Sequence, residues 1–207
     1  MDRGVRSGAI PMRPRYVLRA RTSRRNVRTR QSRREHEALN GIGLQAPDWR
    51  REKPRRFWDP SRKLLLTIRR YQYWRSKHGV VARIFRSAVM LRYRFWSVVT
   101  AADIDPMARI GGGLLLPHPS GVVIHPSAII GVNCLIHQQV TIGTRNDRPG
   151  EAERVPVIEE DVKIYAGAKI LGAVRIGAHA IVGANSVVLE DVPRNATVVG
   201  SPARRIS

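Results

Sequence analysis

A strict spacing of six residues between large aliphatic side chains is the strongest constraint on the fold of this chain. The pattern occupies residues 104–199, and the spacing never slips within its three runs of anchor residues: Ile104, Ile110 and Leu116; Ile124, Ile130, Ile136 and Ile142; Ile158, Ile164, Ile170, Ile176, Val182 and Val188. A period of six fits neither a helix, which repeats every 3.6 residues, nor one long strand, which repeats every two. It fits short strands separated by turns, with every anchor pointing inward.

The residues between the anchors support the same interpretation. The position four after each anchor is small or branched, and we expect it to point inward too: Ala108, Leu114, Ala128, Cys134, Val140, Val162, Ala168, Val174, Ala180, Ser186 and Val192. Glycine often follows an anchor, at positions 111, 131, 143, 177 and 183, and we expect it to supply the positive φ of a tight corner. Short repeats that cannot bury their apolar faces alone stack into a solenoid. Three hexads would form one triangular coil of about 18 residues, with coils about 4.8 Å apart.

The spacing breaks twice. The interval from Leu116 to Ile124 is eight residues, so two extra residues fall in the segment 116–121. The interval from Ile142 to Ile158 is sixteen, which leaves four extra residues after two hexads or ten after one. The polar segment 144–154 should leave a corner of the solenoid as a loop, and insertions on one side of a repeat scaffold often mark its binding face.

The net positive charge lies entirely ahead of the repeats. Residues 1–56 carry a net charge of +12, residues 57–102 carry +9, and residues 103–207 are neutral. We interpret residues 1–56 as a disordered Arg-rich tail, since they hold few large apolar residues. The alternative is an electrostatic contact of this tail with nucleic acid or an anionic membrane. A neutral core behind a basic leader is not typical of nucleic-acid enzymes, whose folded binding face is usually basic.

Residues 57–100 read as a helical hairpin. Apolar residues recur at helical spacing from Leu64 to Val98, and Gly79 is expected to end the first helix. Four arginines in the second helix argue against a membrane span. We expect the hairpin to pack on the end of the solenoid; the alternative is a basic amphipathic hairpin lying on an anionic membrane. No secretory signal is evident, and the lone cysteine, Cys134, suits the cytoplasm.

Asp103 and His118 are the candidate catalytic residues. Their separation along the chain is slightly less than one coil, so the chain has almost returned to the same corner when it reaches His118. A carboxylate beside an imidazole fixes its tautomer and strengthens it as a base. His125 and His137 follow anchors and could line a groove, whereas His179 is expected on the surface. The histidines and Cys134 lack metal-site spacing.

These residues carry a resemblance. The hexads resemble those of the hexapeptide-repeat acyltransferases, whose fold is a left-handed parallel β-helix. The segments Asp-Ile-Asp-Pro-Met-Ala-Arg-Ile-Gly (103–111), His-Pro-Ser-Gly (118–121), Val-Thr-Ile-Gly (140–143) and Ala-Gly-Ala-Lys-Ile-Leu-Gly (166–172) are similar to the serine acetyltransferase branch. The similarity covers about residues 101–205 and implies a mainly β domain at 101–207.

The resemblance also implies a function. It predicts an acetyl-CoA-dependent O-acetyltransferase that converts L-serine to O-acetylserine for cysteine biosynthesis and works as a homotrimer. His118 would be the general base and Asp103 its partner, with no metal. Arg154 would bind the acceptor, and the predicted contacts to CoA are Gly167, Lys169, Arg204 and Arg205.

Two departures from the family bear on the acceptor. The family's aspartate before the catalytic histidine is Pro117 here, and its Arg-His-Pro is Arg154-Val155-Pro156. In the family the missing groups help bind the amino acid. A sugar or polysaccharide O-acetyltransferase of the same fold is therefore the alternative, and a scaffold without enzymatic activity is a third hypothesis.

Overall fold

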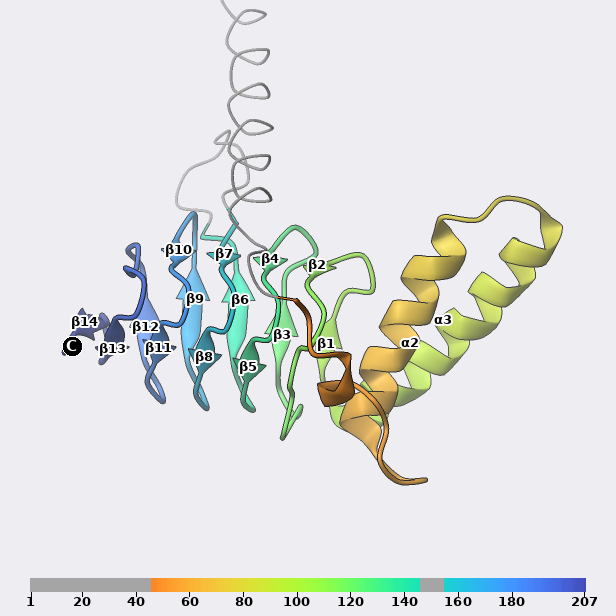
Figure 1. The fold of residues 1–207 in the computed structure, drawn as a ribbon, viewed down its shortest axis with the longest axis horizontal. Coiled ribbons are helices and arrows are strands. Elements are labelled where there is room, and N and C mark those ends of the chain that lie inside the picture. The colour runs from red at the N-terminus through yellow and green to blue at the C-terminus, as the bar shows by residue number, and fades with distance from the viewer. Residues whose placement is uncertain (1–45, 146–154) are drawn as a thin grey trace, which may run out of the picture. The chain divides into compact units, whose positions relative to one another are not determined.

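The computed structural model describes residues 46–145 and 155–207, which all belong to one compact unit. Most of this unit is a three-sided parallel β-helix (Figure 1). The first sheet contains β1 (Asp103–Ile104), β3 (Val123–Ile124), β6 (Thr141–Gly143), β9 (Lys169–Leu171) and β12 (Val187–Val188). The second contains β2 (Arg109–Ile110), β4 (Ile129–Ile130), β7 (Val157–Ile158) and β10 (Arg175–Ile176). The third contains β5 (Leu135–Ile136), β8 (Lys163–Ile164), β11 (Ile181–Val182), β13 (Thr197–Val199) and β14 (Arg204–Arg205).

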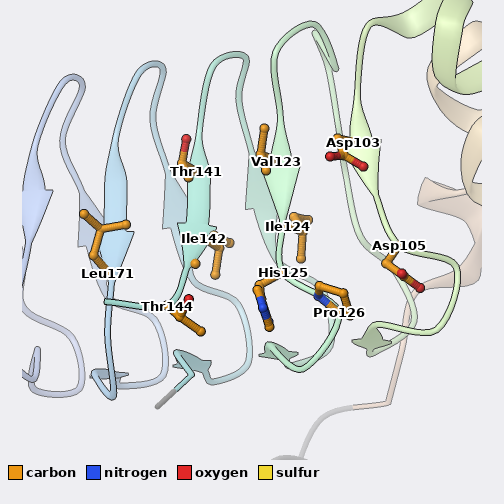
Figure 2. A pocket seen from close by; sticks show the side chains of 11 residues that line it. Asp103, Asp105, Val123, Ile124, His125, Pro126, Thr141, Ile142, Thr144 and Leu171 are labelled. Atoms are coloured by element: carbon orange, nitrogen blue, oxygen red, sulfur yellow. The ribbon is translucent and has the colours of Figure 1, made fainter. Parts of the chain in front are cut away.

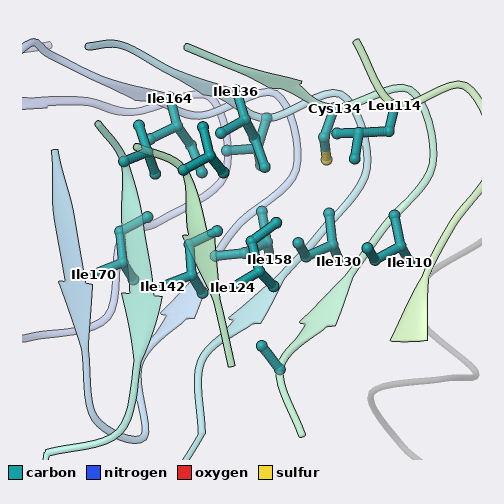
Figure 3. Close-up of a cluster of buried hydrophobic side chains, with 14 of the residues drawn as sticks. Ile110, Leu114, Ile124, Ile130, Cys134, Ile136, Ile142, Ile158, Ile164 and Ile170 are labelled. Carbon is teal, nitrogen blue, oxygen red and sulfur yellow. The ribbon is translucent and has the colours of Figure 1, made fainter. Parts of the chain in front are cut away.

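The six-residue period is one step around this prism. Each anchor stacks on the anchor one coil away, as Ile124 does on Ile142 and Ile130 on Ile158. All thirteen anchors are at most 8% exposed, and the eleven residues predicted to point inward four positions after an anchor, from Ala108 to Val192, are buried as well. Figure 3 shows the isoleucines filling the narrow interior. The predicted inward pair per hexad is therefore confirmed.

The expected role of the glycines after the anchors is wrong. Positive φ occurs instead at corner residues of other kinds, such as Asn133 and Asn185. A Cβ atom on Gly131 would lie 2.6 Å from the backbone carbon of Glu159 in the next coil, and Gly111 and Gly177 have similar backbone contacts. These glycines are needed because adjacent coils approach too closely for a side chain.

Both breaks in the spacing are insertions at corners. Strand partners in adjacent coils are farther apart in sequence for Leu115 and Leu135 than for Val123 and Thr141. The first of these two coils therefore contains the two extra residues, which lie between Leu115 and Val123 as predicted. The chain passes from the first sheet in β6 directly to the second sheet in β7, which is a single step. Of the two alternatives for the second break, ten extra residues is therefore correct.

In the described part of the chain, two α-helices precede the first coil. The helix α2 (Pro60–Arg75) begins with proline at its first position, and α3 (Val80–Thr100) begins after Gly79. Gly79 has φ 103° and is the N-cap of α3, so the prediction that it ends the first helix is wrong; α2 ends at Arg75. Leu64, Leu65 and Ile68 of α2 join the core of the β-helix, which confirms that the hairpin packs on its end (Figure 1).

The segment before α2 differs from the predicted tail. Residues 1–45 lie outside the described residues, but residues 46–56 are ordered and include the 3-10 helix η1 (Trp49–Arg51). The backbone N–H of Asp48 donates to Asn133 Oδ1 at 2.8 Å, and Arg51 donates to the Asn133 carbonyl. The boundary of the tail at residue 56 is therefore wrong, because these residues are held by hydrogen bonds across the first coils rather than by apolar burial.

A buried ion pair closes this end of the solenoid. The carboxylate of Glu52 accepts from Arg69 Nη2 at 2.8 Å and from the backbone N–H of Leu114 at 3.0 Å. Arg69 also donates to the carbonyls of Ile110 and Gly111, at 2.6 and 2.7 Å. No earlier coil exists among the described residues to pair with these backbone groups, so Glu52 and Arg69 take its place.

Candidate functional site

A pocket opens on the outer surface of the first sheet, at the corner that follows β6 (Figure 2). Its polar lining comes from three successive coils: Asp103, Asp105, His125, Thr141 and Thr144. Val123, Pro126 and Leu171 add apolar walls. These residues come together because β1, β3, β6 and β9 lie in register, with Asp103 beside Val123 and Val123 beside Thr141.

The two carboxylates give the pocket an acidic end. Asp103 is exposed at the start of β1, and Asp105 accepts from the backbone N–H of Met107 at 2.6 Å. The hydroxyl of Tyr93 in α3 donates to the carbonyl of Ile104 at 2.8 Å. Ile104 lies between the two aspartates, so this bond anchors the segment that carries them. Burial raises the pKa of Tyr93, and the charges of Asp103 and Asp105 raise it further. Tyr93 therefore remains a protonated donor near neutral pH.

His118 lies on the insertion between the third and first sheets. The backbone N–H of Gly121 donates to the carbonyl of Ala101 at 2.8 Å, so this turn stacks on the residues that lead into Asp103. The side chains of Asp103 and His118 are both exposed. Within the described ranges, no hydrogen bond or ion pair joins Asp103 to His118, and His118 is not among the residues that line the pocket. Their catalytic pairing remains a prediction.

His125 lines the pocket, in agreement with its predicted place beside a groove. Its Nδ1 accepts from the backbone N–H of Ser127 at 3.1 Å. In the neutral ring the proton then sits on Nε2, which makes His125 a hydrogen-bond donor rather than a base at that atom. His137, the other candidate, stacks on Tyr165 with ring centroids 5.2 Å apart. His179 sits outside the pocket and contacts Asp161 at 3.0 Å.

The predicted CoA contacts form two groups. Gly167 and Lys169 lie at one corner, where the Gly167 N–H donates to Gln138 and Lys169 Nζ donates to the Gln139 carbonyl at 2.6 Å. Arg204 and Arg205 lie on β14, the last strand of the stack. Arg154 lies outside the described residues. The structure thus keeps Gly167 and Lys169 together and places the arginine pair elsewhere.

One outward row connects the acidic pocket to Lys169. Asp103, Val123, Thr141 and Lys169 occupy equivalent positions on four successive strands of the first sheet. Three steps of about 4.8 Å separate the ends of this row, or about 14 Å. A carboxylate therefore stands at one end of this row and an ammonium group at the other. This arrangement suits an extended ligand with a neutral or cationic part at one end and an anionic part at the other.

Sequence reasoning missed Asp105, Thr141 and Thr144 as lining residues. A coil of about 18 residues predicts that Thr141 lies one coil beyond Val123, so this signal was present in the sequence.

Cys134 is fully buried, its thiol contacts the carbonyl of Glu159 at 3.1 Å, and burial raises its pKa to about 12. Among the residues that the structure describes, no three His, Cys, Asp or Glu side chains gather into a metal site.

Known proteins share this repeat region. Residues 156–190 match the family described as bacterial transferase hexapeptide (six repeats). The serine acetyltransferase of Synechococcus elongatus is 46% identical over 109 residues, which are 53% of this chain and 44% of that protein. That of Haemophilus influenzae is 39% identical over 136 residues, 66% of this chain and 50% of that protein. The chain thus spans about half the length of the curated relatives it matches.

Solved structures show the same likeness. A serine acetyltransferase in complex with CoA is 33% identical with a TM-score of 0.59, over 72% of this chain and 58% of that one. A soybean serine acetyltransferase complexed with serine is 39% identical with a TM-score of 0.59, over 71% of this chain and 57% of that one. The predicted resemblance to this branch and the predicted left-handed β-helix fold are therefore confirmed.

Proposed function

We propose that this hexapeptide-repeat chain is an acetyl-CoA-dependent serine O-acetyltransferase that produces O-acetylserine for cysteine biosynthesis. One observation carries the proposal: the chain is 39–46% identical to serine acetyltransferases over 109 and 136 residues, and the coils stack the segments that hold Asp103 and His118 at one edge of the first sheet. The serine and CoA named in the titles of similar structures supply the candidate substrates.

The proposed reaction needs one base and no covalent intermediate. His118 takes the proton of the acceptor hydroxyl while the oxygen attacks the thioester carbonyl of acetyl-CoA. The tetrahedral intermediate collapses with loss of the CoA thiolate, which receives the proton from His118. Asp103 orients the imidazole and stabilises its charged form.

The outward row from Asp103 to Lys169 on the first sheet suggests where each substrate would bind. The acceptor would sit beside Asp103, whose carboxylate can accept a hydrogen bond from an ammonium or hydroxyl group, in the pocket that His125 also lines. CoA would extend toward Lys169, whose ammonium group suits a phosphate. Because the N–H of Gly167 is already used within the solenoid, this glycine would contribute space. Arg154 for the acceptor carboxylate, and Arg204 and Arg205 for CoA, are proposed from the resemblance.

Assembly and location follow from the same proposal. A pocket this shallow on one solenoid suits a homotrimer in which a neighbouring solenoid provides the other wall of the CoA groove. No helix in the described part of the chain is long and apolar enough to cross a membrane. A cytoplasmic location is part of the same proposal, since the proposed substrates are acetyl-CoA and serine.

Acetyl transfer tests the proposal directly. We expect the full chain to release thiol from acetyl-CoA with L-serine, and to do so much faster than with a panel of sugars and nucleotide sugars. Turnover with sugars alone would favour the alternative raised by Pro117 and Val155. Absence of transfer to every acceptor would contradict an enzymatic role.

A matched pair of histidine variants tests the base. His118→Ala should lower kcat by about 10²–10⁴-fold with the fold intact. His179→Ala provides the control, since His179 also pairs with an aspartate but lies outside the pocket, and it should retain the native rate. Equal rates in the two variants would place the base elsewhere.

A further inference from the structure

The outer face of α3 is apolar, and none of the described residues covers it. Six aliphatic or aromatic side chains lie within one arc of this helix, at the spacing of an amphipathic stripe: Val80, Val81, Ile84, Leu91, Phe95 and Val98. Leu91 is 72% exposed, Val98 81% and Ile84 63%, whereas the opposite side buries Ala82, Trp96 and Thr100. We call these six residues the α3 face. Packing of α3 on α2 and the first coil does not use it.

Positive charge borders the α3 face. On a helix of 3.6 residues per turn, Arg83 and Arg94 fall on one side of the stripe and Arg92 on the other. All three are exposed, and no ion pair to them exists among the described residues. Residues 60–102 contain ten Lys or Arg and no Asp or Glu. The charges on residues 60–102 are therefore all cationic, and they surround an apolar centre.

A groove at the edge of the face suits a phosphate group. It runs between α2 and α3 and is lined by Tyr71, Arg86, Ser87, Met90, Leu91 and Arg94. Two guanidinium groups and two hydroxyl groups thus surround a hollow that continues from the apolar stripe at Leu91. Aromatic groups extend the other end, where Trp58 packs on Trp96 and Trp96 on Phe95, at centroid distances of 5.6 and 5.0 Å.

We propose that the α3 face docks this protein on an anionic lipid bilayer, with α3 parallel to the surface. Its apolar side chains would enter the boundary between headgroups and acyl chains, and its arginines would remain among the lipid phosphates. The helix has 21 residues, so the contact is about 31 Å long. This inference is independent of the proposed acetyl transfer.

Charge favours lipid over the other candidate occupants. A second copy of the chain would bring the same arginines against this rim, and like charges oppose that contact. Residues 1–45 carry twelve arginines against three acidic residues, so they repel the hairpin as well. An anionic bilayer instead complements the rim and offers an apolar layer for the stripe, and each arginine near such a surface contributes about fivefold in affinity.

Flotation of the full chain with lipid vesicles tests the docking. The native chain should float with vesicles of phosphatidylcholine and phosphatidylglycerol, and much less with phosphatidylcholine alone. The variant Ile84→Ser/Leu91→Ser/Phe95→Ser should bind about 100-fold more weakly. The control Met107→Ser/Ile206→Ser replaces exposed apolar residues of the solenoid, which are 53% and 65% exposed, and should bind as the native chain does. Circular dichroism checks that each variant is folded.

Three results would overturn the proposal. If the native chain does not float with anionic vesicles, the face is not a lipid contact. If the triple variant floats as well as the native chain, the arginines of residues 1–45 account for binding. If the triple variant instead forms smaller oligomers in sedimentation equilibrium while the control does not, the occupant is another copy of the chain.

Discussion

Replacing Glu52 by glutamine should destabilise the folded chain more than its place in an Arg-rich segment suggests. The side chain is only 6% exposed, and its carboxylate accepts two hydrogen bonds from Arg69, at 2.8 and 3.0 Å, and one from the Leu114 N–H. The amide of glutamine carries no charge and turns one acceptor into a donor that faces the guanidinium group. Arg69 would then lack a counter-ion.

The loss of folding stability depends on the hydrogen bonds that Arg69 retains in the variant. Removing one partner of a buried ion pair costs about 3–5 kcal/mol. Arg69 is 18% exposed and retains its bonds to the carbonyls of Ile110 and Gly111, so we expect a loss of about 2–3 kcal/mol, below the range for a fully buried pair. For a domain of this size that loss lowers Tm by about 4–12 °C.

Thermal unfolding followed by circular dichroism measures this loss at fixed protein concentration, because assembly would shift Tm. Glu190→Gln is the control, since Glu190 is 80% exposed and lies 3.8 Å from Arg204; it should leave Tm unchanged. The double variant Glu52→Gln/Arg69→Gln should cost less than the sum of the single variants, because both break one contact. Equal Tm values for Glu52→Gln and Glu190→Gln would refute the assigned role of the ion pair.

Three further predictions concern the coils and the site. Gly131→Ala should destabilise by about 1–3 kcal/mol because its Cβ would lie 2.6 Å from the Glu159 backbone; Gly143→Ala, whose Cβ meets only Thr141 Cγ2 at 4.0 Å, should not, and equal urea midpoints would contradict this account. Cys134 should resist a thiol reagent until the chain unfolds, and stability should fall as pH rises above about 9, where the unfolded thiol ionises while the native thiol, with its pKa raised to about 12, does not; rapid labelling of the native chain would show that it is accessible. Asp103→Asn should lower kcat by about 10²–10⁴-fold, while Asp161→Asn, which alters the pair with His179, should not; unchanged turnover in Asp103→Asn would remove Asp103 from the mechanism.

The regular part of the fold was predictable because burial repeats every six residues. Each anchor has one inward direction, and stacking it on the next coil is the only way to remove it from water, so periodicity alone predicts the prism. The handedness of the coil came only from the family resemblance. The glycines show a second limit: Gly131 and Gly143 both follow an anchor, but only Gly131 faces the next backbone closely. That difference depends on the shape of each corner.

The cap at the first coil could not be predicted, because polar contacts over long separations leave no periodic signal. Glu52 bonds Leu114 and Arg69, both distant from it along the chain, and it lies within a segment whose composition resembles a disordered tail. The candidate site could be predicted in part. The coil length predicts that Asp103 and His118 approach one edge, but it does not determine whether their side chains meet.

The two ends of the solenoid are closed by different means, and this asymmetry bears on where the proposed chemistry lies. At the C-terminal end, β14 turns back and pairs antiparallel with β13, which covers the last edge with backbone. At the other end, α2 and Glu52 cover the first coil with side chains, and Tyr93 of α3 bonds the Ile104 carbonyl. Side-chain caps can be altered one residue at a time without changing the repeat. Asp103 and Asp105 both belong to this first coil, so the acidic end of the pocket is positioned by the helices as much as by the β-helix. The helical hairpin would then serve two purposes. The side that packs on the first coil would hold the acidic residues in place, and the opposite side would present the α3 face.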